Sequence, residues 1–380
     1  MDPDAVAPAR PAPDPDSFVV LDDEAALERI RAAAAARTPF SLLRLGDGEA
    51  VLLSIDESAW LQDLEQLHRH WGAEGVTLGD VLRVRRDLEA GIAAADVVGL
   101  RPDVLGVTAP DDLLARPLEE TGDFVRKNFE LREPGIQDLV ARRLALANRV
   151  MTRLPKSPDQ DYCSSWIHWE MLAHGLIDEL LDAVDEVVLV TTHPELGPVV
   201  AEKFGVRAHV ITVPGKFVDT GRSGVHVPTR YDQMRAELSG FAPGTLALVG
   251  AGIPGKVYCH WLKEAGCVAL DVGATFDAWI GRASRTVVLR HRFGVADGRS
   301  VPADLQIVER VPDEPAVEPS SAPAARRLQG TQARLERANR QRMKAERQRD
   351  AARRELAALR GRRSVRAALA AARLFRRPFR

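Results

Sequence analysis

Short apolar runs alternate with helix-forming segments between residues 186 and 271. The runs at 186–191 and 245–249 are apolar almost throughout, as expected of strands that are buried on both faces of a sheet. Strand–helix–strand repeats at this spacing are typical of parallel sheets that are covered on both sides. The sequence therefore predicts an α/β fold with a Rossmann-like, mostly parallel sheet and helices on both faces. Its strands are expected at 186–191, 208–213, 245–249 and 268–271, with helices at 194–204, 227–238 and 254–265.

The first half of the chain adds two more strands and several helices. Residues 40–45 and 96–100 are short apolar runs that predict buried strands. Residues 22–36 have acids in the first turn and an alanine-rich body, which predicts a helix. Further helices are expected over most of 57–95 and 124–153, and after Ser164 or Ser165, either of which would cap it.

The two ends of the chain differ in composition from its body. Residues 326–380 contain 19 Lys and Arg against 4 Asp and Glu, a charge of +15, so residues 1–325 carry −17 of the total of −2. Residues 1–17 are rich in Pro, Ala and Asp, which predicts disorder and does not resemble a signal peptide. We expect an α/β catalytic domain at 18–310, a Pro-rich linker at 311–325 and a basic helical tail at 326–380.

The tail has two candidate roles. Its Leu and Ala residues form a thin heptad seam, so a coiled coil that makes a homo-oligomer and a single solvated helix both remain open. Residues 365–379 place apolar side chains among arginines, which suits an anionic membrane surface. Nucleic acid is not expected as a partner because no base-reading motif accompanies the charge. Three unpaired cysteines indicate a reducing compartment, so we expect a cytoplasmic protein that lies peripherally at the inner face of the cell membrane.

A turn of glycines and acids follows the first long strand, with the sequence Gly46-Asp47-Gly48-Glu49. In parallel sheets the carboxyl ends of the strands are where ligands bind. Asp47 and Glu49 would suit a hard divalent cation, Mn²⁺ or Mg²⁺, and the phosphate oxygens that it bridges. Gly-Asp-Gly is also an ordinary turn composition, and Glu49 could instead cap the following helix.

Other strand ends carry further candidate groups. Gly250 and Gly252 belong to a Gly-x-Gly-x-x-Gly turn between a strand and a helix, a pattern that can hold phosphate at the helix N-terminus. His193 and His168 are candidate bases because imidazole titrates near neutral pH. The remaining candidates for donor binding lie at the same strand ends or in the loop after residue 213: Arg44, Gly46, Gly48, Thr191, Lys216, Arg222, Lys256, Asp271 and Gly273.

These motifs resemble the GT-D-fold glycosyltransferases. The resemblance rests on Arg44-x-Gly46-Asp47-Gly48-Glu49 and on the block from Gly250 to Gly273, with its Leu-Asp-Val-Gly strand end. It implies that Asp47 and Glu49 bind a divalent metal and the diphosphate of a nucleotide sugar, with Gly250, Gly252 and Asp271 near the nucleotide. The stretch before Tyr231 departs from the family pattern, so donor and acceptor stay open.

The resemblance implies a metal-dependent, hexosyltransferase-like enzyme that uses a nucleotide sugar, with a UDP-sugar as the expected donor. The acceptor would be a glycan or a lipid-linked sugar, as in cell-surface polysaccharide biosynthesis. Two other interpretations remain: an S-adenosylmethionine-dependent methyltransferase, because Gly46-Asp47-Gly48 resembles a cofactor turn of that class, and a noncatalytic nucleotide-binding assembly protein. The glycosyltransferase interpretation requires the turns near residues 47 and 250 to lie together.

Overall fold

The computed structural model describes residues 18–55, 71, 76–101, 147, 150–214, 226–284, 289, 292–295 and 300–308. The chain divides into two units, Met1–Arg310 and Val311–Arg380, and every described residue lies in the first. The predicted disordered N-terminus, the linker, the basic tail and most of the helix expected at 124–153 lie outside the described residues.

The described part of the chain forms one eight-stranded sheet in which all pairs of neighbouring strands are parallel. The order across the sheet is β1-β4-β3-β2-β8-β7-β5-β6. The α/β class and the parallel sheet predicted from the apolar runs are therefore confirmed. The strands are β1 Val19–Val20, β2 Phe40–Arg44, β3 Val97–Leu100, β4 Asp161–Ser164, β5 Glu186–Thr191, β6 Arg207–Thr212, β7 Leu246–Val249 and β8 Val268–Asp271.

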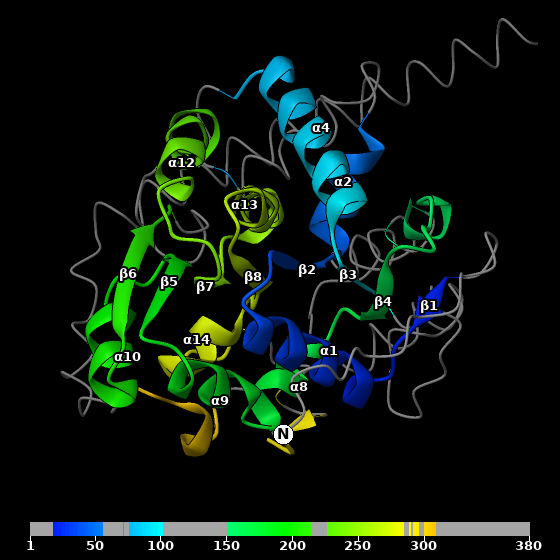
Figure 1. The fold of residues 1–380 in the computed structure, drawn as a ribbon. Helices are drawn as coiled ribbons and strands as arrows, with labels where there is room; N and C mark the ends of the chain where they lie inside the picture. The colour runs from blue at the N-terminus through cyan, green and yellow to red at the C-terminus, as the bar shows by residue number, and fades with distance from the viewer. Residues whose placement is uncertain are drawn as a thin grey trace, which may run out of the picture. The chain divides into compact units, whose positions relative to one another are not determined.

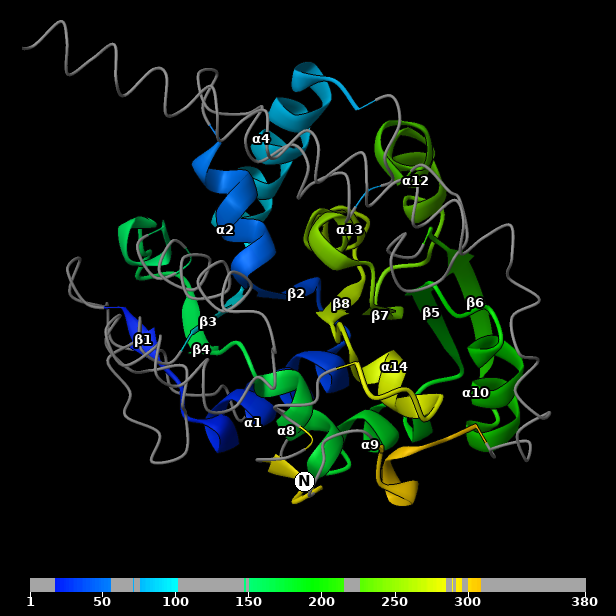
Figure 2. The same cartoon turned by 180° about the vertical axis from the view of Figure 1, so that it is seen from behind.

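Helices cover both faces of this sheet, and the two views of the ribbon agree on the layers (Figures 1 and 2). The first face is covered by α2 (Asp47–Ser54), α4 (Leu78–Ala94), α12 (Tyr231–Leu238) and α13 (Gly252–Glu264). The second face is covered by α1 (Asp23–Ala36), α8 (Ile167–Ala173), α9 (Leu176–Asp182), α10 (Leu196–Phe204) and α14 (Thr275–Trp279). Two short elements lie outside these layers: the π-helical turn His226–Arg230 and the 3-10 turn Ala303–Leu305.

Successive residues of each strand enter different hydrophobic cores, because side chains alternate across a sheet. Leu42 packs in the core of the second face and Leu43 in that of the first, and neither is accessible to solvent. The same alternation holds along β5, where Leu189 and Val190 lie in different cores. The central positions of β5 and β7 are apolar for this reason, which is the pattern that the sequence displays.

Two strands of the sheet, β1 and β4, were not predicted. β4 has the sequence Asp-Tyr-Cys-Ser, and it is a strand because it pairs with β3 on one side and β1 on the other. Ser164 therefore ends a strand, although the sequence placed it at the start of a helix. Its hydroxyl still accepts a hydrogen bond from the backbone of Trp166 at 3.2 Å, and α8 begins at Ile167. No helix among the described residues is both long and apolar enough to cross a bilayer.

Candidate functional site

The chain leaves two neighbouring central strands toward opposite faces of the sheet. α2 follows β2 directly and packs on the first face, whereas α14 follows β8 and packs on the second. In open α/β sheets such a divergence leaves a crevice outside the carboxyl ends of the strands, and ligands bind there. The carboxyl edge of β2 and β8 is therefore the candidate site, and both sequence motifs lie at it or beside it.

The two acids of the first turn face different surroundings. Asp47 is the first residue of α2 and is exposed, whereas Glu49 is buried with 5% of its surface accessible. The Gly46 backbone N–H donates to Glu49 Oε2 at 2.8 Å, so Glu49 caps its own helix. Residues two apart on a helix do not share a face, so these two carboxylates cannot converge on one ion while α2 keeps this geometry.

The acid turn and the glycine-rich turn lie side by side. A Cβ atom added to Gly48 would be 3.1 Å from the side chain of Ile253 in α13. One helical turn further on, Lys256 Nζ lies 3.0 Å from Glu49 Oε1. The structure therefore brings together the two segments that the sequence singled out, although 200 residues separate them along the chain.

Four charged side chains form a buried quartet across these turns: Arg44, Glu49, Lys256 and Asp271. Lys256 Nζ lies between the carboxylates of Glu49 and Asp271. Its distance to Asp271 Oδ2 is 3.2 Å, but the geometry is not that of a hydrogen bond. Lys256 Nζ also donates a hydrogen bond to the Gly252 carbonyl at 3.1 Å. Arg44 completes the group through Asp271 Oδ1 at 3.1 Å and the Asp271 carbonyl at 2.8 Å. The quartet contains two cations and two carboxylates and is neutral as a whole.

Mutual attraction keeps two members of the quartet ionised in spite of their burial. Burial alone would raise the pKa of Glu49, but the Lys256 charge and the hydrogen bonds that Glu49 accepts from Lys256 and from backbone amides together outweigh burial, so the net shift is downward. Burial likewise lowers the pKa of Lys256, and the opposing charges of Asp271 and Glu49 raise it above its ordinary value. Lys256 and Asp271, with 6% and 1% of their surfaces accessible, are thus committed to internal ion pairs. In this arrangement neither side chain is presented to a nucleotide.

Glycines make room for Arg44 to lie along the strand ends. A Cβ at Gly99 in β3 would be 3.1 Å from Arg44 Cγ. Gly273 adopts φ +49, and a Cβ there would collide with Arg44 Nη2. Arg44 also donates through Nη1 to the Ser165 carbonyl at 3.1 Å and lies 2.7 Å from His168 Nδ1. Arg44 therefore ties the ends of β2 and β8 to the segment that follows β4.

The two predicted phosphate glycines have different surroundings. Gly252 is exposed and adopts φ +63, and no atom of the described residues lies within 4 Å of where its Cβ would be. Gly250 is packed instead, since a Cβ there would be 2.9 Å from the Gly273 carbonyl and would strike the ring of Phe276. The start of α13 at Gly252, where backbone amides and the helix dipole favour anions, is therefore the accessible part of this turn.

His193 lies on another part of the edge. Its backbone N–H donates to the buried Thr191 hydroxyl at 3.1 Å, and its ring Nε2 is 2.9 Å from Asp277 Oδ1, a partner that sequence reasoning missed. β5, which leads to His193, is three strands from β2, or roughly 14 Å at ~4.8 Å per strand. This separation disfavours His193 as the base for a sugar held at Asp47. Lys216 and Arg222 lie outside the described residues.

Among the residues that the structure describes, a divalent cation fits this edge in one way. Both oxygens of Glu49 are already engaged, by the Gly46 amide and by Lys256, so the Asp47–Glu49 pair does not fit a shared ion. The exposed Asp47 alone does fit, because Mg²⁺ is commonly held by one or two carboxylates together with substrate phosphates. In keeping with this, the described residues contain no group of three His, Cys, Asp or Glu that could hold a metal ion.

A comparison with protein-family models agrees with this type of fold. Residues 21–128 match the family model of the GT-D fold-like domain, and this range contains α1, β2, α2, α4 and β3. The resemblance drawn from the sequence motifs is confirmed for that part of the chain.

Two solved structures are similar over 67% of this chain and 78% of theirs, each with a TM-score of 0.39. One, 15% identical, is described as a selenomethionine-substituted domain of unknown function 1792. The other, 16% identical, carries the description that this domain "has a distinct glycosyltransferase fold". No curated protein sequence matches the chain.

Proposed function

We propose that this protein is a metal-dependent glycosyltransferase of the hexosyltransferase type. It would move a sugar from a nucleotide sugar, with a UDP-sugar as the expected donor, to a glycan or lipid-linked acceptor. The observation that carries the proposal is the exposed Asp47 beside the open N-terminus of α13, within a chain whose residues 21–128 match the GT-D fold-like domain.

The donor diphosphate would lie at the start of α13. The amides around Gly252 and the positive end of the helix dipole favour its charge, and no side chain of the described residues fills the space beside Gly252. Asp47 would hold Mn²⁺ or Mg²⁺ together with the phosphate oxygens. When bound, the cation stabilises the negative charge that develops on the departing diphosphate. Lys216 and Arg222 remain proposed donors to the same phosphates.

The rest of the edge would hold these groups in place. Arg44 joins the ends of β2 and β8 through Asp271, so the turns that follow these strands keep a fixed separation. Catalysis needs charged and hydrogen-bonding groups that are oriented before negative charge develops on the leaving diphosphate. Interactions that are equally strong in the ground state and the transition state do not accelerate sugar transfer. The quartet supplies that rigidity without contacting the reacting atoms.

A ligand screen tests the proposal against its two rivals. We expect UDP- or GDP-sugars with Mn²⁺ to raise the melting temperature of the full chain and S-adenosylmethionine to leave it unchanged. Slow release of free sugar from the same donor should accompany binding. Stabilisation by S-adenosylmethionine would instead favour the methyltransferase, and donor binding without any sugar release would favour a noncatalytic nucleotide-binding protein.

We also propose that the basic tail holds the enzyme at the anionic inner face of the cell membrane, where lipid-linked acceptors reside. The proposal rests on the charge of +15 over residues 326–380 and on the apolar positions within 365–379. In liposome flotation, the full chain should float with anionic vesicles and stay behind with neutral ones. A chain that ends at residue 361 should lose this binding, and equal flotation of the two chains would reject the tail as an anchor.

A further inference from the structure

We infer that Glu49 is a positioning residue and not a cation ligand, and that Lys256 is the group that holds it in this role. The inference rests on the proposed function, in which Asp47 binds the cation. Glu49 lies two residues after Asp47, and this spacing by itself would suggest that the two carboxylates share a metal ion. The structure instead gives Glu49 partners on two different elements.

The two oxygens of Glu49 join two helices. Oε2 accepts from the Gly46 amide at 2.8 Å, which fixes the first turn of α2, and Oε1 pairs with Lys256 of α13 at 3.0 Å. Asp47 lies between Gly46 and Glu49 in the same turn, and Gly252 accepts from Lys256 through its carbonyl at 3.1 Å. Glu49 and Lys256 together therefore hold the first turn of α2, which carries the exposed Asp47, beside the first turns of α13.

Charge balance shows why Glu49 cannot easily leave Lys256. The quartet is buried and neutral, and removing one member leaves an uncompensated charge inside the protein. Glu49→Gln would leave a net +1 and Lys256→Met a net −1. The double variant Glu49→Gln/Lys256→Met would leave the neutral pair of Arg44 and Asp271. A Glu49 that served the cation would have to abandon Lys256 in the same way.

A double-mutant cycle on the full-length protein tests the pairing. Each single variant should melt at a lower temperature than the wild type, and the double variant should melt above the Lys256→Met variant because its buried charges balance again. Glu89→Gln and Lys203→Met are matched controls, since they break exposed ion pairs with Arg85 and Asp178 and should change little. A double variant at least as unstable as the sum of the two single changes would overturn the pairing.

Mn²⁺ affinity, measured by calorimetry without donor, separates a positioning residue from a ligand. If Asp47 binds the ion, the Lys256→Met variant should bind Mn²⁺ about five- to tenfold more tightly than the wild type, because it lacks a positive charge near the site. The Glu49→Gln variant should bind Mn²⁺ more weakly by a similar factor, because it lacks a negative charge there. The double variant should return to within about threefold of the wild type, since its net charge is restored. If Glu49 is a ligand, a folded double variant will bind Mn²⁺ more than about tenfold more weakly, and the inference fails.

The two readouts also separate this inference from the proposed function. A wild-type protein that binds no Mn²⁺ but shows the expected stability cycle would contradict the cation and support the role of Glu49 in joining α2 to α13. Mn²⁺ binding that disappears in Asp47→Asn and persists in the double variant would support both.

Discussion

Asp47→Asn is expected to lower the turnover of a nucleotide sugar by about 10²–10³-fold and to leave the fold intact. Asp47 is exposed and makes no ion pair within the described part of the chain, so the change to an amide removes little from the folded state. What it removes is the carboxylate that we assign to the cation. The measurement is steady-state turnover with Mn²⁺, together with the melting temperature.

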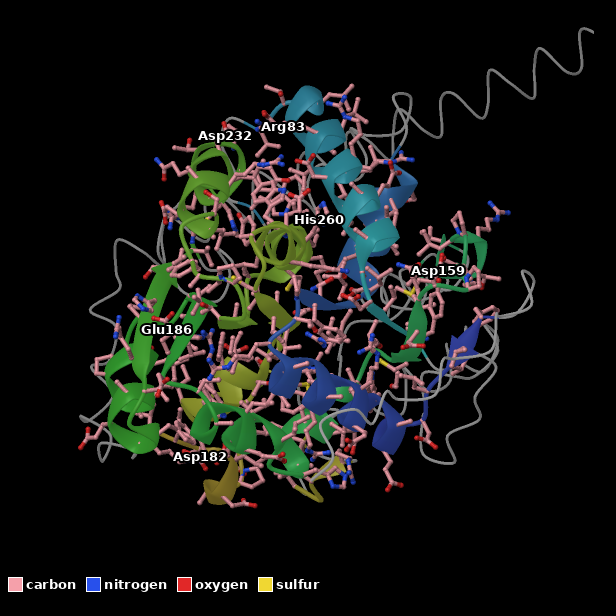
Figure 3. All side chains as sticks on the ribbon, in the orientation of Figure 1. Arg83, Asp159, Asp182, Glu186, Asp232 and His260 are labelled. Atoms are coloured by element: carbon pink, nitrogen blue, oxygen red, sulfur yellow. The ribbon has the colours of Figure 1, made fainter. Side chains whose placement is uncertain are left out.

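Asp182→Asn is the matched control for this change. Asp182 is also exposed, and it ends α9 on the second face of the sheet, away from α2 (Figure 3). We expect its turnover and melting temperature to equal those of the wild type. Full metal-dependent activity in Asp47→Asn would remove Asp47 from the mechanism, and an equal loss of activity in Asp182→Asn would point to a general effect of charge.

Gly273→Ala is expected to lower the free energy of unfolding by about 3–5 kcal/mol, the largest effect on stability that we predict. The added Cβ would occupy the position of Arg44 Nη2 and would also sit at φ +49. Arg44 would have to withdraw from Asp271, which would leave a carboxylate with 1% of its surface accessible short of one of its two cations. Urea unfolding followed by circular dichroism measures the change.

Gly175→Ala separates strain of the backbone from the collision. Gly175 has a similar positive φ of +68, but no atom of the part of the chain that the structure describes lies within 4 Å of the Cβ that the substitution would add. Its cost should be about 1–2 kcal/mol, the penalty of a left-handed residue alone. If Gly273→Ala costs no more than Gly175→Ala, Arg44 does not hold the strand ends together as described.

Some contacts between helices could not be read from the sequence at all. Arg83 of α4 pairs with Asp232 of α12 at 2.6 Å, and Figure 3 labels the two residues near one another. His226 lies buried near the same helices, 2.7 Å from the Tyr258 hydroxyl, and burial lowers its pKa to about 3. Neither pair has a local signal, because the partners come from different segments and their types are common on any helix.

The class of fold was determined by the sequence alone. Strands such as β5 and β7 are apolar at every central position because each residue enters one of two cores, and this leaves a pattern that no exposed strand shows. The sequence also placed the acid turn and the glycine-rich turn at strand ends, and parallel strands bring their carboxyl ends to one edge. β4 was not predicted because its composition is not that of a strand. It is a strand because it pairs with β1 and β3.

Which site residues are exposed to a ligand and which are buried in ion pairs was decided only by the tertiary structure. A spacing of two residues puts Asp47 and Glu49 in one turn, but whether each faces solvent or the interior depends on what packs against α2. Glu49 is buried in an ion pair with Lys256, which lies 207 positions further along the chain. Asp271 is paired in the same way with Arg44, from which it is separated by 227 positions. A buried charge is costly unless an opposite charge lies beside it, and which residues form such a pair depends on how distant segments pack together.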